Sequence, residues 1–380
     1  MPAQLPGIER LGDLNGKKVL VRVDFNTPVH LVDGRLEVAD DFRIRATLPL
    51  LEDLKSRGAL VACMTHFGRP NGKVVPEFSV EPVRRRLNEL CDGIQLLENL
   101  RFNPGEEAND PAFGASLVEG FDCFINEAFG ASHRAHASIM IPPTLLPSAA
   151  GPNLQKEVST LLGALENPVR PFVAIVGGAK VKDKLAITKV LSQKADAVIV
   201  GGGMAYTFEF AEGRTIGGSL FDETNVENCR ELLATGKIRI PIDSRGLENG
   251  QPFGPDGGIA PVQSFGEDIP EGSMGLDIGT LSAAMFVEEI LNAGTILWNG
   301  PMGVFEDTRF ATGTEAIANA VATSKGFSVV GGGDSVAAIQ KFHLENEVDF
   351  VSTGGGASLE LVELGDLPGL RALRDSKVGA

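Results

Sequence analysis

Short apolar runs alternate with turns and amphipathic stretches along the whole chain, and this alternation is the feature that most constrains the fold. Helical spacing marks the stretches between the runs, such as DDFRIRATLPLLEDLKSRG and LSAAMFVEEILNAG. The runs typical of strands are KKVLVRVDF, ALVACMTHF, IQLLENL and CFINEAF, followed in the second half by PFVAIVGG, DAVIVGGG, KIRIPID, TILWNG, FSVVGGGD and DFVSTGGG. Continuous apolar strands that alternate with helices indicate parallel sheets covered on both faces. We therefore predict an α/β fold.

The chain of 380 residues is long enough for two domains. A seam is expected in residues 141–171, which are rich in proline at both ends and carry a helical segment at about residues 154–165. Charge supports the division, because residues 1–155 hold 16 Lys and Arg against 20 Asp and Glu, whereas the remainder holds 18 against 30. The first half is the more cationic one and is therefore the better place for an anionic substrate.

A formal net charge of −16 argues against broad nucleic-acid binding and against docking on anionic lipid, because both polyanions would repel the chain. The N-terminal MPAQLPGIERLGDLNGK lacks the apolar stretch of a signal peptide, and no apolar run approaches the ~18 residues of a membrane span.

The cysteines lie far apart and form no CxxC pair, which favours free thiols in a reducing compartment over zinc or disulfides. They are Cys63, Cys91, Cys123 and Cys229. We expect a cytoplasmic protein.

Five glycine-rich turns follow apolar runs in the second half: VGGAK, VGGGMA, WNGPMG, VGGGDS and STGGGAS. Each precedes a helical stretch, so each would lie where a strand ends and the free N–H groups of a helix begin. Glycine lets the backbone approach a phosphate closely. The chain has no GxxxxGK followed by Ser or Thr, which excludes a P-loop, and no GxGxxG, which argues against a dinucleotide site. The turns predict a site for nucleotide phosphates.

Charged residues stand beside these turns. Lys180 and Lys184 are one helical turn apart after GGAK, so both can face the same phosphates. Asp334 follows three glycines at a predicted helix start, where a carboxylate suits Mg²⁺ bound to a nucleotide, although an aspartate there also commonly caps a helix. Glu306 in GPMGVFE can bond a ribose hydroxyl or can be a solvated surface residue.

Cationic and hydrogen-bonding residues take the corresponding places in the first half. Because the carboxyl ends of parallel strands meet at one edge of a sheet, we expect these residues to converge on a small anion, for which arginine is well suited. They are Asp24, Asn26, His66, Arg69, Arg101, His133 and Arg134, with Arg43 at the start of the helix after the first strand. His133 and His136 have no Cys or carboxylate at metal-ligand spacing, which disfavours a metal site, and a general-base role for His133 stays open on these grounds.

Ten blocks in the same order resemble the phosphoglycerate kinase family over essentially the whole chain. They are VLVRVDFN, RIRATLP, HFGRP, LLENLRF, FGASHRAHAS, GGAKVKDK, GGGMAYTF, WNGPMGVFE, GGGDS and VSTGGGAS. The resemblance implies two Rossmann-like three-layer domains with parallel sheets, joined by a hinge helix. Residues 1–153 would bind 3-phosphoglycerate, residues 154–365 would bind the nucleotide, and the tail 366–380 would pack back on the first domain.

The resemblance also implies the reaction and the residues that perform it. The reaction is reversible phosphoryl transfer from 1,3-bisphosphoglycerate to ADP, giving 3-phosphoglycerate and ATP with Mg²⁺, in a monomer that closes about its hinge. The implied substrate-binding residues are Asp24, Asn26, Arg43, His66, Arg69, Arg101, His133 and Arg134. The implied nucleotide-binding residues are Lys184, Gly275, Asn299, Glu306, Gly332, Gly333, Asp334 and Ser335, with Asp334 holding Mg²⁺ through the nucleotide.

The implied catalytic residues are Arg43, Lys180 and Lys184. They would work by positioning the substrates and by neutralising charge on the transferring phosphoryl group. The acceptor in the ATP-consuming direction is a carboxylate, which is already ionised at pH 7 with a reference pKa near ~4. No general base is then needed, and the base role of His133 falls away.

The chain also departs from the family pattern. The segment before Leu96 is shorter by roughly one strand–helix unit, Glu127 replaces a usual aspartate, and Lys182 stands where a small residue is common. Two rival hypotheses are a degenerate member that only binds its ligands and a kinase for another small carboxylate. The first predicts loss of Arg43, Lys180, Lys184 or Asp334, and all four are present. The second is disfavoured because the residues expected to contact the 3-phosphate are intact.

Overall fold

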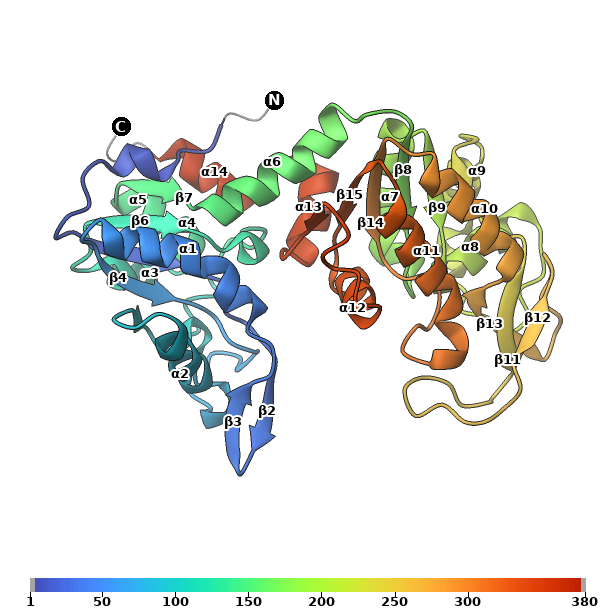
Figure 1. Ribbon diagram of the computed structural model, residues 1–380, viewed down its shortest axis with the longest axis horizontal. Coiled ribbons are helices and arrows are strands. Elements are labelled where there is room, and N and C mark those ends of the chain that lie inside the picture. The colour runs from blue at the N-terminus through green and yellow to red at the C-terminus, as the bar shows by residue number, and fades with distance from the viewer. Residues whose placement is uncertain (1–3, 377–380) are drawn as a thin grey trace. The chain divides into compact units, whose positions relative to one another are not determined.

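The computed structural model describes residues 4–376, and Figure 1 labels its elements. The described chain divides into two compact units. Unit 1 runs to Ser159 and resumes at Leu364, whereas unit 2 is Thr160–Glu363. Each unit has its own central sheet and its own hydrophobic core, as an independent domain requires.

The central sheet of unit 1 is parallel throughout, with the strand order β5-β4-β1-β6-β7. Its strands are β1 (Lys18–Arg22), β4 (Leu60–Met64), β5 (Gln95–Leu96), β6 (Cys123–Asn126) and β7 (Ser148–Ala150). β1 lies in the middle, where Arg22 stands opposite both Met64 of β4 and Asn126 of β6. The carboxyl ends of the three central strands therefore lie side by side at one edge.

Both faces of this sheet are buried, which explains why its strands are apolar at nearly every position. On one face, Val19 and Val21 of β1 belong to a core with Ile44 and Leu87 from two of the covering helices. On the other face, Leu20 is fully buried as well. The helices of unit 1 are α1 (Phe42–Ser56), α2 (Glu81–Leu90), α3 (Pro111–Val118), α4 (Ala137–Met140), α5 (Pro142–Leu145) and α14 (Pro368–Asp375).

An antiparallel hairpin, β2 (Val29–Val32) and β3 (Arg35–Val38), is inserted between β1 and α1 (Figure 1). The apolar runs of the sequence did not predict this hairpin. Its two-residue turn is Asp33-Gly34, with φ values of 47° and 78°. An Asp-Gly pair between alternating residues is a strong hairpin signal, because both central residues of the favoured turn need positive φ.

The central sheet of unit 2 is also parallel, with the order β10-β9-β8-β14-β15-β16. Its strands are β8 (Phe172–Val176), β9 (Ala197–Val200), β10 (Ile238–Arg239), β14 (Thr295–Asn299), β15 (Phe327–Val330) and β16 (Phe350–Val351). The helices are α7 (Val181–Lys194), α8 (Ala205–Glu212), α9 (Val226–Leu233), α10 (Thr280–Leu291), α11 (Thr312–Thr323), α12 (Gly333–Lys341) and α13 (Gly356–Leu364). Trp298 of β14 is fully buried at the centre of the core.

Unit 2 also has a small antiparallel sheet of order β12-β11-β13, which was not predicted either. Its strands are β11 (Ser244–Glu248), β12 (Gln263–Phe265) and β13 (Ser273–Ile278). β11 has the sequence SRGLE and therefore lacks the continuous apolar run by which the other strands were found. The predicted α/β class with parallel central sheets is confirmed, and these antiparallel additions refine it.

Helix α6 (Pro152–Glu166) confirms the helical segment expected at about residues 154–165, and the boundary between the two units falls within it. Near the C-terminus, α14 packs on α4, α5 and β7, and the Gly369 N–H donates to Ser132 O at 2.9 Å. Residues 377–380 of the predicted tail lie outside the described residues.

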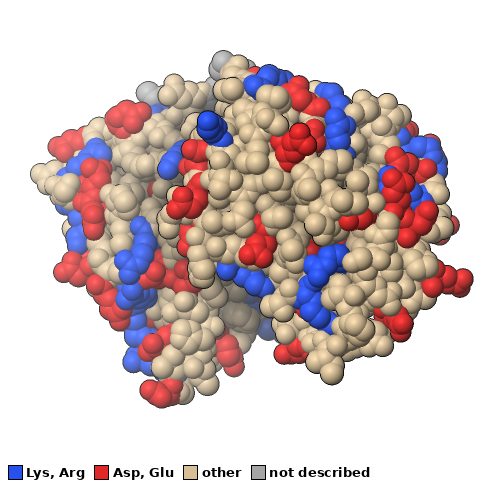
Figure 2. Space-filling view, turned by 45° about the vertical axis from the view of Figure 1, so that its right-hand side comes forward, with Lys and Arg blue, Asp and Glu red and all other residues tan. Residues whose placement is uncertain are grey.

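Acidic and basic side chains are interspersed over the face shown in Figure 2. All four cysteines are free and buried. Among the described residues, no helix has both the length and the apolar character needed to cross a membrane.

Candidate active site

Polar residues follow four neighbouring strands at the carboxyl edge of the unit 1 sheet. Asp24 and Asn26 follow β1, His66 and Arg69 follow β4, Arg101 follows β5, and His133 and Arg134 follow β6. The parallel register places these strand ends together, as the sequence pattern predicted. Arg43 lies in the first turn of α1, which follows the inserted hairpin.

Arg43 and Asp24 form an ion pair at this edge. Arg43 Nη1 is 2.5 Å from Asp24 Oδ2, and the two side chains are 33% and 14% exposed. Burial opposes ionisation of Asp24, but the nearby charges, Arg43 first among them, outweigh it and hold the pKa of this carboxyl below its ordinary value. Asp24 is therefore ionised at pH 7 and orients the guanidinium of Arg43.

A buried arginine that was not predicted from the sequence forms a hydrogen bond with His66. Arg22, the last residue of β1, has no exposed surface, and its Nη2 lies 3.2 Å from His66 Nδ1. Because a guanidinium only donates, Nδ1 must accept, which assigns the imidazole proton to Nε2. Burial lowers the pKa of His66 to about 3, so the ring is neutral at pH 7.

The same arginine begins a buried chain of hydrogen bonds. Arg22 Nε donates to Ser138 Oγ at 2.9 Å, and the Ser138 hydroxyl donates to Glu106 Oε1 at 2.7 Å. His136 Nδ1 lies 3.7 Å from the same Glu106 oxygen, and burial lowers the pKa of this histidine to about 4. A charged residue inside an otherwise apolar strand was the available signal for Arg22. No local pattern marks Glu106, which comes from a loop.

The loop after β4 is held by residues that follow β1 and β5. Asn26 Oδ1 accepts from Gly68 N at 2.9 Å, and Arg101 Nη1 donates to Gly68 O at 2.8 Å. Arg101 is 5% exposed and also pairs with Glu107 at 3.1 Å. Arg69, the next residue of the loop, is exposed. Asn26 and Arg101 thus shape the loop that presents Arg69.

His133 and Arg134 contact each other after β6. Arg134 Nε donates to His133 Nε2 at 3.1 Å, so this nitrogen carries no proton. The charge of Arg134 acts on Arg101, as does the charge of Arg22, which shows that the arginines share one region. Arginines outnumber carboxylates at this edge, and an excess of guanidinium groups beside neutral imidazoles suits a small multivalent anion.

In unit 2 the predicted glycine turns occupy the carboxyl ends of β8, β9, β14 and β15, and several of them line a cavity of about 660 Å³. Gly275, Glu306 and Asp334 are part of its lining. A side chain at Gly275 would meet the Tyr206 hydroxyl, since a Cβ there would lie 2.3 Å from Tyr206 Oη. Glycine therefore lets the backbone of β13 lie close to Tyr206, and the cavity volume is in the range of small-molecule sites.

Two of the predicted nucleotide-binding residues bond to neighbouring loops. Asn299 is 3% exposed; its Oδ1 accepts from Lys184 Nζ, and its Nδ2 donates to Gly331 O at 2.8 Å. Ser335 is fully buried and accepts from Gly300 N at 2.6 Å. These bonds tie the turn after β14 to the turn after β15. Gly332, with φ of 89°, and Gly333 lie in the second of these turns.

The two lysines expected to face the same phosphates differ in environment. Lys184 lies in the first turn of α7, and burial lowers its pKa while Asp334 opposes the change. Lys180 is the residue before α7; it is exposed and lines an adjoining hollow of about 400 Å³ together with Lys182. Asp334 therefore acts electrostatically on Lys184, the lysine that also contacts Asn299.

Asp334 has the chemistry required of a Mg²⁺ ligand. Its carboxylate is exposed in the first turn of α12 and lines the cavity. Within the described part of the chain, no group of three or more His, Cys, Asp or Glu residues is placed to hold a metal ion. Mg²⁺ is commonly held by one or two carboxylates together with substrate phosphates, and the Asp334 carboxylate beside the glycine turns fits that pattern.

Comparisons with known proteins agree along the chain. A family model described as phosphoglycerate kinase matches residues 8–95 and 91–364. A phosphoglycerate kinase of Rubrobacter xylanophilus is 48% identical over 386 aligned positions, covering 95% of this chain and 96% of the relative, and one of Moorella thermoacetica is 46% identical, covering 96% and 98%. The solved phosphoglycerate kinase of Coxiella burnetii superposes with a TM-score of 0.87 at 35% identity and covers 98% of this chain and 100% of its own.

The two matches of the family model overlap at residues 91–95, in the segment that the resemblance predicts to be short. The strand-end residues of both units lie inside the matched ranges. Taken with the arginine-rich edge of unit 1 and the glycine-lined cavity of unit 2, these matches show that the chain belongs to the phosphoglycerate kinase family, whose enzymes reversibly transfer a phosphoryl group between 1,3-bisphosphoglycerate and ADP in glycolysis.

Proposed function

We propose that this phosphoglycerate kinase divides its two substrates between its two units. Residues 1–153 with the tail from 366 would bind 3-phosphoglycerate, and residues 154–365 would bind ATP or ADP. The observation that carries the proposal is the contrast between the two sheet edges. In unit 1 the edge presents guanidinium groups, whereas in unit 2 it presents bare glycine backbone around a cavity of about 660 Å³.

The arginines are proposed to hold the phosphate and carboxylate of 3-phosphoglycerate. Arg69, Arg101 and Arg134 come from three strand ends of one sheet, and arginine is the side chain best suited to bond phosphate and carboxylate groups. Asn26 and His66 add neutral polar groups, and the assigned Nε2 proton of His66 is available to an oxygen acceptor. Asp24 keeps Arg43 in place and would accept from a substrate hydroxyl.

Chemistry on this site needs cations rather than a base. The acceptor carboxylate is already ionised at pH 7, so the task is to position it and to offset charge on the transferring phosphoryl group. Arg43, Lys180 and Lys184 are the proposed catalytic residues. His133 is unsuited to proton abstraction in the arrangement seen, since its Nε2 accepts from Arg134.

Mg²⁺ is the proposed cofactor, bound with the nucleotide and held on the protein side by Asp334. The ion would neutralise part of the phosphate charge when bound. The turn Gly332–Ser335 would contribute backbone N–H groups at the start of α12, where the helix dipole favours phosphate. Gly275 and Glu306 would contact the nucleoside, and Asn299 would hold Lys184 toward the phosphates.

Closure about α6 is proposed to bring the bound substrates into line. The N-terminal turn of α6 is hydrogen-bonded to unit 1. Glu127 Oε1 accepts from Asn153 N at 3.2 Å, and Asn153 Nδ2 donates to Ala46 O of α1 at 2.6 Å. A hinge at α6 would therefore move α1, and with it Arg43, as part of unit 1. Closure also excludes water from the phosphoryl group.

A coupled spectrophotometric assay with 3-phosphoglycerate, ATP and Mg²⁺ tests the proposal. We expect turnover that stops when EDTA removes the metal and resumes when Mg²⁺ is restored. Separate calorimetric titrations should show that 3-phosphoglycerate binds residues of unit 1 and ADP binds residues of unit 2, using Arg69→Ala and Gly275→Ala as probes. Loss of ADP binding in Arg69→Ala with 3-phosphoglycerate binding intact would refute the division.

We further propose that the enzyme is a monomer in the cytoplasm. Each unit has its own buried core, and the four buried cysteines are unpaired thiols, as expected in a reducing compartment. Sedimentation equilibrium at micromolar concentration should give the mass of a single chain, 40.1 kDa. A dimer mass that persists on dilution would contradict the monomer.

A further inference from the structure

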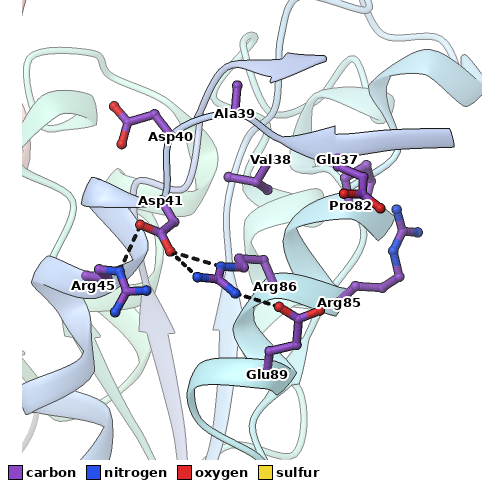
Figure 3. A pocket seen from close by; sticks show the side chains of 10 residues that line it. All are labelled: Glu37, Val38, Ala39, Asp40, Asp41, Arg45, Pro82, Arg85, Arg86 and Glu89. Atoms are coloured by element: carbon purple, nitrogen blue, oxygen red, sulfur yellow. Dashed lines mark hydrogen bonds and ion pairs between the residues drawn. The ribbon is translucent and has the colours of Figure 1, made fainter. Parts of the chain in front are cut away.

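The carboxyl edge of the unit 1 sheet, where 3-phosphoglycerate is proposed to bind, is called the substrate edge below. A charged pocket beside the hairpin of unit 1 contains none of the residues proposed to bind that substrate. It has a volume of about 510 Å³ and is formed by the end of β3, the start of α1 and one face of α2 (Figure 3). Its guanidinium groups are already bonded within the protein: Arg86 bonds Asp41 and Glu89, and Arg45 bonds Asp41. These pairings make the pocket a poor anion site, and their common partner is Asp41.

Asp41 stands at the start of α1, but its carboxylate accepts hydrogen bonds from two arginines instead of capping the helix. Such a residue commonly caps the first turn with its own side chain, but Asp41 makes no such bond. Its Oδ1 accepts from Arg45 Nε at 2.8 Å, and its Oδ2 accepts from Arg86 Nε and Nη2 at 2.9 and 2.7 Å. Figure 3 shows both arginines converging on this carboxylate.

Arg86 belongs to α2, so the bond ties two helices together at the first turn of α1. The preceding residue of α2 holds the same segment further back, because Arg85 Nη2 donates to Leu36 O of β3 at 2.5 Å. Two consecutive arginines of α2 thus fix both ends of the stretch from Leu36 to Asp41. We call Asp41, Arg85 and Arg86 the α2 clamp.

The clamp acts on the turn that carries Arg43. Residues two apart on a helix point in nearly opposite directions, whereas residues four apart share a face. Asp41 and Arg45 therefore face α2, while Arg43 faces the substrate edge and bonds Asp24 at 2.5 Å. The first turn of α1 is therefore held on two sides, through Asp41 by the α2 clamp and through Arg43 by Asp24.

We propose that Arg86, through the two hydrogen bonds that its guanidinium donates to Asp41, is a positioning residue that sets the guanidinium of Arg43 for phosphoryl transfer. The inference rests on the proposed catalytic role of Arg43. Arg86 does not touch the reacting groups; it fixes where α1 begins relative to the sheet edge. A small displacement of a catalytic cation is costly, since about 1 Å of misplacement can lower a rate on the order of 10²-fold.

The test measures kcat and both KM values for Arg86→Gln, Asp41→Asn and the double variant. We expect each single variant to lose kcat on the order of tenfold, with the KM for nucleotide, which binds unit 2, changed less than about twofold. The double variant should lose no more than either single variant, because both remove the same bond. Arg86→Lys, which keeps the charge but only part of the geometry, should fall between wild type and Arg86→Gln.

Arg84→Gln is the matched control, because Arg84 is the neighbouring arginine of α2 and bonds Glu81 and Leu96 O rather than the start of α1. Its kcat should stay within about twofold of wild type. Equal kcat losses in Arg84→Gln and Arg86→Gln would overturn the clamp, as would additive losses in the double variant. Should Arg86→Gln fail to fold, as judged by circular dichroism, Asp41→Asn and Arg86→Lys carry the same test.

The Arg43→Ala background separates this inference from the proposed function. If Arg43→Ala loses kcat, adding Arg86→Gln should cause no further loss, because the group that the clamp positions is already absent. A further tenfold loss in that background would overturn the clamp while leaving the role of Arg43 intact. An unchanged kcat in Arg43→Ala itself would instead overturn the proposed role of Arg43, and the clamp with it.

Discussion

Arg43 is restrained by an ion pair while its side chain stays partly exposed. In its ion pair with Asp24, the arginine side chain is 33% exposed and the aspartate side chain is 14% exposed. The value of the pair lies in orientation, because a guanidinium held at a fixed angle can meet a developing charge without reorganising.

We predict that Arg43→Ala loses kcat on the order of 10³-fold or more, the range of an arginine that stabilises transferring phosphate in other systems. The affinity for ADP should be retained, because the proposed nucleotide residues belong to unit 2. Steady-state kinetics in both directions and calorimetry with ADP measure the two quantities. Asp53→Ala, which removes an exposed residue of the same helix, is the control. An unchanged kcat would remove Arg43 from its proposed role.

Buried polar residues beneath the substrate edge show the limit of reading single residues. Arg22, Ser138 and Glu106 are all fully buried and bond one another in sequence. Removing any one of them would leave its neighbour buried without a hydrogen-bond partner, and that neighbour's full desolvation cost would then lower stability. Such a network explains why a charged residue is tolerated in the middle strand of an apolar sheet.

At the scale of elements, the turn after β15 distinguishes two adjacent glycines. Gly332 has φ of 89°, and a Cβ there would lie 2.6 Å from Asn299 Nδ2. Gly333 has neither constraint, since nothing lies within 4 Å of its Cβ position. The first glycine is therefore required by the backbone, whereas the second leaves room beside the start of α12.

We predict that Gly332→Ala destabilises unit 2 by roughly 1–3 kcal/mol, the cost of a strained backbone conformation, and raises the KM for nucleotide by disturbing Asn299 and Lys184. Gly333→Ala should leave the thermal midpoint of unfolding unchanged and serves as the control for stability. Differential scanning calorimetry and steady-state kinetics measure the two effects. Equal midpoints for the two variants would show that the turn has relaxed and that the strain argument fails.

The edge strand β5, which follows the segment that the resemblance predicts to be short, has only two residues, Gln95 and Leu96. Arg84 Nη2 donates to Leu96 O at 3.2 Å, and Lys55 Nζ donates to Asp92 O at 2.5 Å. A short edge covered by charged side chains discourages pairing with a second chain. Arg101 follows β5 and so lies at the carboxyl edge of the sheet together with the other strand-end residues.

At the scale of the whole molecule, three buried carboxyl groups couple stability to pH. Burial raises the pKa of Glu127 and Glu209 to about 8 and that of Asp277 to about 7. Because these values lie above those of the unfolded chain, the folded protein binds more protons between about pH 4.5 and pH 8. The free energy of unfolding therefore falls as pH rises through this window. Below the window these groups are protonated in both the folded and the unfolded state, so they no longer make the free energy of unfolding depend on pH.

We predict that the thermal midpoints of both units fall by several degrees between about pH 5 and pH 8. Glu127→Gln should flatten the profile of unit 1, and Glu209→Gln should flatten that of unit 2, because a neutral amide has no proton to lose. Scanning calorimetry of the two transitions measures this, with Glu52→Gln on the surface of α1 as the control. Profiles of Glu127→Gln and Glu209→Gln that run parallel to wild type would show that these groups do not govern the slope.

The sequence by itself determined the fold class and the location of both sheet edges, because periodic apolar runs and glycine turns are local properties that parallel pairing converts into one edge. The same pattern predicts that strand-end residues such as Asn26, Arg101 and Asp334 lie at these edges. Tertiary structure alone decided which side chains meet. The contact of Arg22 with His66, the bond between Asp41 and Arg86, and the burial that raises the pKa of Glu127 each join segments distant in sequence. Desolvation and hydrogen-bond geometry depend on that packing, so no local pattern encodes them.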